Sequence, residues 1–150
     1  MKVLVPVDGS DNSMRAVNYA LGLAKKNPDT KFTLLAVATI RMDELLVNLA
    51  ELQRHNSELV NFTDLQKQFE EAPKSVLEHV KALFEESGIQ VETAMLMGDP
   101  ANRIIQYITD NGFENIIIGS RGMGVLKSAI LGSVAYKVLA KTNIPVTIIK

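Results

Sequence analysis

The chain has no cysteine and no tryptophan, and nowhere in it do about 18 apolar residues follow one another, the length a membrane span needs. The absence of cysteine excludes disulfides, thiol catalysis and cysteine-bound metal sites, and it fits a reducing cytosol. The apolar run at the start of the chain is too short for a signal peptide. We therefore expect a cytoplasmic protein without a membrane partner.

The chain also has little net charge. Its 150 residues carry a formal charge of −1, with 47% hydrophobic and 22% charged residues. These values describe an ordinary folded domain with a core of its own, and they argue against a disordered chain or a partner as strongly anionic as nucleic acid. No linker, repeat or low-complexity segment divides the sequence, so we expect a single domain over residues 1–150.

Acidic residues are absent from residue 119 to the carboxyl end, where five basic residues occur. Residues 41–86, by contrast, hold ten acidic and five basic residues. A positive stretch around a glycine-rich loop suits an anionic ligand. A chance cluster of solvated lysines would give the same pattern, so charge alone does not decide between the two. The five basic residues are Arg121, Lys127, Lys137, Lys141 and Lys150.

Short apolar runs alternate with helical apolar spacing along the whole chain. The apolar runs predict strands at residues 2–7, 31–38, 89–97, 113–119 and 145–150. The helical spacing predicts helices after residue 10, within 45–52, over 73–87, from 100 and over 133–141. This alternation predicts one α/β domain, an open five-stranded parallel sheet with helices on both faces.

Some local points remain open in the sequence. Either Ser10 or Asp11 suits the N-cap of the first helix. Pro73 either lies in the first turn of its helix or kinks a longer one. We expect the leucines and methionines in the core, and the two histidines, His55 and His79, on helix surfaces without a functional role.

The expected fold indicates where a ligand would bind. In open parallel sheets, ligands lie beyond the carboxyl ends of the strands, where the strand order reverses. For the common order 3-2-1-4-5, this place lies between the first and fourth strands. The turns that follow these strands are Asp8–Ser10 and Gly119–Gly124, and both contain glycine. We therefore expect a ligand in the crevice where the two turns meet.

The glycines of the second turn do not match the commonest nucleotide motifs. A Walker phosphate loop would need glycine where Leu126 stands, and a dinucleotide fingerprint would need glycine at Lys127. The pattern present is G-x-x-G-x9-G-S, which brings flexible backbone and a helix start toward an anion. A strand end, a loop glycine and a plain N-cap would explain the same letters structurally. The motif residues are Gly119, Gly122, Gly132 and Ser133.

Together with this motif, "VPVDGS" near the start and "PVTII" at the end make the chain resemble the universal stress protein family. The resemblance covers essentially the whole chain. The spaced glycine motif is the version carried by the ATP-binding branch of the family. The resemblance therefore implies a nucleotide-binding domain that holds ATP, with or without Mg²⁺.

The resemblance also implies ten binding residues. Asp8 would lie near the ribose or adenine, and the backbone of Val37 would read the adenine edge. Gly119, Arg121 and Gly122 would line the ribose-phosphate path. The remaining implied positions are Pro6 beside the nucleotide, Gly98 near the ribose, and Gly132, Ser133 and Val134 at the terminal phosphates. Nothing transfers to residues 41–72, where the family varies widely.

Three functions fit these features. The first is an ATP-binding regulatory protein of the stress response, with protein partners that the sequence does not name. The second is a slow ATP hydrolase, although the sequence indicates no general base, no catalytic residue and no metal-ligand set; Ser10 and Ser13 have no base partner. The third is a protein-interaction module with a vestigial nucleotide pocket, which the long segment 41–72 would serve.

The last expected strand, residues 145–150, is apolar and would lie at an edge of the sheet. An unprotected apolar edge either aggregates or pairs. Members of the family commonly pair this strand in a two-fold dimer, so the resemblance implies a homodimer. The alternative is that the long middle segment folds across this edge and covers it.

Overall fold

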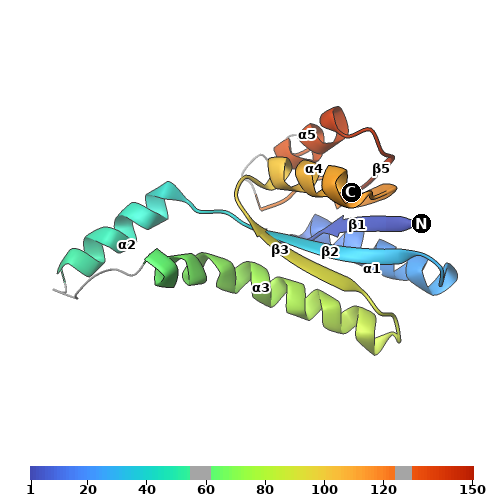
Figure 1. Ribbon diagram of the computed structural model, residues 1–150, viewed down its shortest axis with the longest axis horizontal. Coiled ribbons are helices and arrows are strands. Elements are labelled where there is room, and N and C mark those ends of the chain that lie inside the picture. The colour runs from blue at the N-terminus through green and yellow to red at the C-terminus, as the bar shows by residue number, and fades with distance from the viewer. Residues whose placement is uncertain (55–61, 124–129) are drawn as a thin grey trace.

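The computed structural model describes residues 1–54, 62–123 and 130–150. Its centre is a five-stranded sheet in the order β3-β2-β1-β4-β5, with every neighbouring pair parallel. The predicted sheet, strand order and α/β class are therefore confirmed (Figure 1). The strands are β1 (Lys2–Pro6), β2 (Lys31–Ala38), β3 (Glu92–Met97), β4 (Asn115–Gly119) and β5 (Val146–Ile149).

Helices cover both faces of the sheet, as the alternating sequence pattern predicts. One buried cluster joins α1 and α3 to the sheet, and a second joins α4 and α5 to the opposite face. Within the described chain, no helix is both long enough and apolar enough to span a membrane. The helices are α1 (Asp11–Lys26), α2 (Met42–Arg54), α3 (Phe62–Glu86), α4 (Pro100–Asn111) and α5 (Ser133–Lys141).

The central strand β1 explains why its sequence is a continuous apolar run. Val3 and Val5 belong to the cluster under α1 and α3, whereas Leu4 belongs to the cluster under α4 and α5. All three side chains are at most 1% exposed. Because β1 pairs with β2 on one side and β4 on the other, it has no wet face and no free edge.

Strand β3 begins at Glu92, three residues later than the sequence predicts. The cause is the end of the preceding helix. Ile89 donates its N–H to the Phe84 carbonyl at 3.0 Å, so its backbone closes the turn after α3 rather than joining the sheet. The side chains of Ile89 and Val91 still pack against the core, which explains their apolar character.

Helix α3 is much longer than residues 73–87, and Pro73 lies in its interior. The interpretation that put Pro73 in a first turn is therefore wrong. The helix starts earlier because Leu65, which is 5% exposed, and the half-buried Phe69 extend the apolar face of Val76 and Leu77 toward the amino end. Burial along one continuous face outweighs the hydrogen bond that proline removes.

The expectation that all leucines and methionines are buried is wrong for several of them. Helix α2 projects away from the sheet beyond the carboxyl end of β2 (Figure 1), and none of its described side chains is fully buried. His79 is exposed on α3, as predicted, and His55 lies outside the described residues. Among the described residues beyond the first, the most exposed leucines and methionines are Met42 at 64%, Leu46 at 60%, Met123 at 76% and Leu139 at 47%.

The described part of the middle segment lies at the β3 side of the sheet. Helix α3 packs on β2 and β3, and α2 extends from the same side of the molecule (Figure 1). Strand β5 is at the opposite edge. The described residues of this segment therefore do not cover the last strand, contrary to the alternative interpretation.

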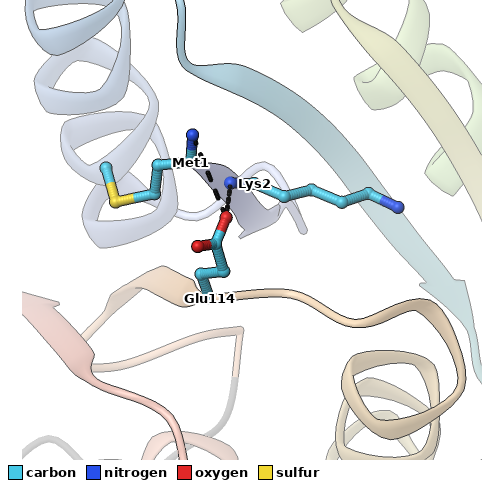
Figure 2. A network of polar contacts seen from close by, with 3 residues as sticks. All are labelled: Met1, Lys2 and Glu114. Carbon is cyan, nitrogen blue, oxygen red and sulfur yellow. Dashed lines mark hydrogen bonds and ion pairs between the residues drawn. The ribbon is translucent and has the colours of Figure 1, made fainter.

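At the amino ends of the strands, polar contacts join the chain start to β4 (Figure 2). Glu114 accepts a hydrogen bond from the Lys2 backbone N–H at 2.7 Å and lies 3.9 Å from the terminal amine of Met1. The Lys2 ammonium lies 4.7 Å from the centre of the Phe113 ring. These exposed contacts are structural, and exposed ion pairs of this kind stabilise a fold by about 0–1 kcal/mol. The residues that the sequence singles out lie at the other end of the sheet, after the carboxyl ends of the strands, which we call the carboxyl edge.

Candidate functional site

The turns after β1 and β4 meet at the carboxyl edge of the sheet, as the strand order predicts. A Cβ built on Gly122 would lie only 2.6 Å from Asp8 Oδ2. Ser10 Oγ lies 3.5 Å from the Arg121 carbonyl oxygen. The structure therefore brings together two predicted groups of residues that are more than 100 positions apart in the sequence.

Asp8 is held in a defined position by the first turn of α1. Its Oδ1 accepts hydrogen bonds from the Ser10 N–H at 2.9 Å and from Ser10 Oγ at 2.6 Å. Its own N–H donates to Ser13 Oγ at 3.1 Å. Ser10 is also the N-cap of α1, which resolves the choice between Ser10 and Asp11. The second carboxylate oxygen, Oδ2, faces Gly122 of the other turn.

Close packing of the protein itself requires glycine at residue 119, independently of any ligand. A Cβ at this residue would lie 2.7 Å from the Asn12 carbonyl carbon and 2.8 Å from both the Asn12 oxygen and the Ser13 nitrogen. The first turn of α1 therefore rests directly on the backbone of β4. This contact explains a glycine at residue 119 without any ligand, and it fixes α1 next to the second turn.

Gly132 closes the glycine-rich loop. Its N–H donates to the Ser120 carbonyl at 2.7 Å, and a Cβ there would lie 3.3 Å from both Arg121 Cα and the Ser120 oxygen. It is also the N-cap residue of α5, so the prediction that Gly132 and Ser133 open the last helix is confirmed. Ser133 is exposed, and Val134 is half-buried against the core under α4 and α5.

The amino end of α5 differs from those of α1 and α4, which also begin at this edge. Ser10 caps α1 and Asp99 caps α4 through side-chain oxygens. At α5 no side chain of the described residues accepts from the first-turn N–H groups. Such N–H groups, at the positive end of a helix dipole, are suited to bind an anion.

Val37 and Gly98 lie at neighbouring strand ends on the same edge. Gly98 donates its N–H to the Ala38 carbonyl at 2.9 Å, directly after the paired strands β2 and β3. The φ of Gly98 is +136°, and a Cβ there would lie 2.8 Å from Arg103 Nε. The backbone conformation and the contact with Arg103 therefore explain glycine at residue 98 without any ligand. Val37 is half-buried beside it.

The ten predicted positions therefore form two groups on one edge. Asp8, Gly119, Arg121, Gly122, Gly132, Ser133 and Val134 belong to the turns and helix starts around β1 and β4. Val37 and Gly98 belong to the ends of β2 and β3. Pro6, buried at the end of β1, lies between the groups because it pairs with Leu35 of β2. Residues 124–129 of the loop lie outside the described residues.

Sequence reasoning missed one pair of residues at this edge. Asn12 Nδ2 donates to Ser120 Oγ at 3.1 Å, and the two residues are 9% and 2% exposed. Asn12 belongs to no motif, and Ser120 lies inside the G-x-x-G spacing at a position to which the sequence assigned no role. Among the described residues, no group of three or more His, Cys, Asp or Glu is arranged to hold a metal ion.

Comparison with known proteins agrees with this architecture. The model of the universal stress protein family matches residues 1–150. Universal stress protein YxiE of Bacillus subtilis is 33% identical over 150 residues, which cover 99% of this chain and 98% of the relative. The solved structure of MJ0577, a universal stress protein of Methanocaldococcus jannaschii, superimposes with a TM-score of 0.78 at 28% identity, over 99% of this chain and 94% of that one.

More distant solved structures share the fold and hold nucleotides. A universal stress family protein of Arabidopsis thaliana with AMP bound has a TM-score of 0.68 at 22% identity, covering 100% of this chain and 91% of that one. A member in complex with cAMP has a TM-score of 0.70 at 19% identity, over 100% of this chain and 97% of that one. A member from Archaeoglobus fulgidus in complex with dAMP has a TM-score of 0.64 at 18% identity, over 100% of this chain and 98% of that one. On the full-length family match and the 33% identity to YxiE, this chain belongs to the universal stress protein family.

Proposed function

We propose that this chain binds ATP in the crevice between the turns after β1 and β4, and that it acts as a nucleotide-dependent regulatory protein of the stress response. One observation carries the proposal. The hydrogen bond from the Gly132 N–H to the Ser120 carbonyl sets the start of α5, which has no side-chain cap among the described residues, beside the turn that holds Asp8. Helix starts of this kind are well suited to phosphate.

The phosphate half of the proposed site is built from backbone and local charge. The first-turn N–H groups of α5 would accept the terminal phosphates, with the exposed hydroxyl of Ser133 beside them. Gly122 and Gly132 allow close backbone approach at this turn, because a Cβ on Gly122 would meet Asp8 and a Cβ on Gly132 would meet Arg121 and Ser120. No acidic residue occurs after residue 119, so nothing of like charge on this part of the chain repels the phosphates.

The base half of the proposed site lies at the ends of β2 and β3. Val37 and Gly98 offer half-buried apolar surface and backbone groups at the same edge. Family members of the same fold hold AMP, cAMP and dAMP, which supports an adenine base. We assign Asp8 to the ribose, because its carboxylate would repel phosphate and instead suits hydroxyl donors.

Mg²⁺ would accompany the phosphates rather than occupy a site of the protein alone. Mg²⁺ is usually held by one or two carboxylates, water and substrate phosphates. Asp8 is the acidic residue that the structure brings to the glycine-rich loop, and Oδ1 already accepts from Ser10. Its remaining oxygen, Oδ2, is the one assigned to the ribose, so Mg²⁺ would be held by the phosphates and water.

We propose binding without efficient catalysis. The carboxylate of Asp8 is engaged by Ser10, and His79 is exposed on α3 with no hydrogen bond to a residue of the crevice among the described residues. Neither group is arranged as a base to activate water against a phosphate. Slow hydrolysis remains compatible with such a site, and regulation by the bound state would need no turnover.

We also propose a homodimer through β5. This strand is an edge strand with half-buried residues throughout, and α5 beside it exposes Tyr136 at 63% and Leu139 at 47%. Pairing of two such edges would satisfy the outward N–H and C=O groups of both chains. An added role in protein interaction is favoured by α2, where Met42, Leu46 and Val47 are more than half exposed.

The binding proposal is tested by calorimetric titration with ATP, and by mass spectrometry of nucleotide released from the purified protein. We expect saturable ATP binding, and a loss of about tenfold or more in Asp8→Ala, because a hydrogen bond to a charged group contributes about 1.5–3 kcal/mol. Asp29→Ala is the matched control, since Asp29 is exposed in the turn after α1 at the other end of the sheet. A folded wild-type protein that binds no adenine nucleotide would refute the proposal.

A further inference from the structure

Ser120 lies at the start of the glycine-rich loop and is hydrogen-bonded to Gly132 at the end of that loop. It follows directly after β4 and is only 2% exposed. Its three polar groups contact three different elements. Its N–H donates to the Ile149 carbonyl of β5 at 2.7 Å, its carbonyl accepts from the Gly132 N–H at 2.7 Å, and its Oγ accepts from Asn12 Nδ2 at 3.1 Å.

Asn12 provides the other half of this junction. It lies in the first turn of α1, is 9% exposed, and rests with its backbone against Gly119. The first turn of α1 therefore meets the end of β4 at two consecutive residues, through packing at Gly119 and through a buried hydrogen bond at Ser120. Polar groups this deeply buried are costly unless they are paired, so the geometry of the pair is well determined.

The position of Asp8 depends on the same turn of α1. The Asp8 N–H donates to Ser13 Oγ, and its carboxylate accepts from Ser10, so Asp8 moves with this turn. On the other side, the start of α5 follows Ser120 through the Gly132 hydrogen bond. The Asn12–Ser120 bond is thus a buried side-chain link between the two walls of the crevice, in addition to the exposed 3.5 Å contact from Ser10 Oγ to the Arg121 carbonyl.

We propose that Asn12 and Ser120 are positioning residues that hold the start of α5 in register with the Asp8 turn, so that the crevice is preorganised for phosphate. This inference rests on the proposed function and adds two residues to which the motif assigns no role. The base half of the site depends on β2, β3 and the Gly98 turn, which neither residue contacts through a hydrogen bond of the described chain. Asp8, assigned to the ribose, keeps its own hydrogen bonds to Ser10 and Ser13 without the pair. The pair therefore affects affinity for the phosphates much more than affinity for the nucleoside.

A merely structural pair would behave differently from a positioning pair. Ser120→Ala leaves Asn12 Nδ2 buried without its acceptor, whereas the double variant removes both partners together. Removing both partners of a buried hydrogen bond costs much less stability than removing one. Stability should therefore recover in the double variant, but the link between the two walls stays broken, so phosphate affinity should not recover.

The experiment compares Asn12→Ala, Ser120→Ala, the double variant and Ser120→Thr, which keeps the hydroxyl. Calorimetry measures affinity for ATP and for adenosine, and thermal unfolding measures stability. We expect about tenfold weaker ATP binding in both single variants and in the double variant, with adenosine affinity within twofold of wild type. Ser120→Thr should retain most of the ATP affinity. Thr33→Val is the control, because Thr33 is also 2% exposed but bonds Glu92 at 3.3 Å between β2 and β3.

Hydrogen exchange of the Gly132 amide in the nucleotide-free protein provides a second, independent measurement. The single and double variants should exchange this amide about tenfold faster than wild type, and Thr33→Val should not. Unchanged Gly132 exchange, or ATP and adenosine affinities that fall together, would overturn the positioning role. A wild-type protein that binds neither ligand would overturn the proposed function and the phosphate role with it, while the exchange result still decides whether the pair positions the loop.

Discussion

Replacing Gly119 by alanine should destabilise the fold, because the new methyl group meets backbone atoms. The Cβ would lie 2.7 Å from the Asn12 carbonyl carbon, whereas ordinary contact begins at 3.4 Å, so the first turn of α1 has to move by about 0.7 Å. Overpacking of this kind costs about 1–3 kcal/mol, and three close backbone contacts favour the upper end. Alanine restricts the unfolded chain and returns about 0.4–1 kcal/mol, so the net loss is about 2 kcal/mol.

Thermal unfolding monitored by circular dichroism measures this loss. For a domain of this size, about 2 kcal/mol corresponds to a fall in Tm of about 4–8 °C. Gly22→Ala in α1, the helix that Gly119→Ala would displace, is the control, since a Cβ at Gly22 has no atom within 4 Å. It should raise stability by about 0.5–1 kcal/mol, because alanine favours a helix interior over glycine. If Gly119→Ala is as stable as wild type, the direct contact between α1 and β4 is refuted.

Three further predictions concern the crevice and the sheet edge. Gly132→Val should weaken ATP binding at least tenfold, or about 1.4 kcal/mol, because the loop must give way at the 3.3 Å contacts with Arg121 and Ser120. Equal ATP affinity in a folded variant would contradict this. Raised salt should weaken binding of ATP more than binding of adenosine. Steady-state hydrolysis should stay below about one per second, under the range typical of enzymes; a faster rate that Asp8→Ala abolishes would show an enzyme. Ile148→Pro should shift a wild-type dimer toward monomer in light scattering while ATP still binds, whereas Ile148→Ala, which keeps the N–H, should remain dimeric; a wild-type monomer at micromolar concentration would exclude the dimer.

The choice of Ile148 follows from the hydrogen bonds of β5. The carbonyls of Pro145 and Ile149 accept from β4, at Ile116 and Ser120. Because strand groups alternate with a period of two, the N–H of Thr147 also faces β4 and that of Ile148 faces the open edge. Proline at residue 147 would break the sheet itself, whereas at residue 148 it removes only an outward donor.

Local sequence signals were sufficient to predict most of the fold. Each strand is a short apolar run bounded by turn residues, and burial of both faces of the sheet makes that pattern readable without a structure. Ser10, Asp99 and Gly132 mark helix starts for reasons contained within a few neighbouring residues. The spacing of the glycines likewise pointed to the edge of the sheet where the two turns meet.

Longer-range features required the tertiary structure. Only the structure shows that Pro73 lies inside α3, since the earlier start of that helix depends on burial of Leu65. The exposure of Leu46 likewise depends on where α2 projects, which its own amphipathic pattern does not reveal.

The sequence by itself determined where the helices, strands and glycine turns lie, because period, capping and turn chemistry act over a few residues. Tertiary structure decided what each glycine and polar side chain at the crevice contacts. Gly119 is glycine because α1 rests on it, and Asn12 meets Ser120 across 108 positions of the chain. Such contacts depend on the order of the strands and on the packing of α1 against β4, and no local pattern encodes either of these.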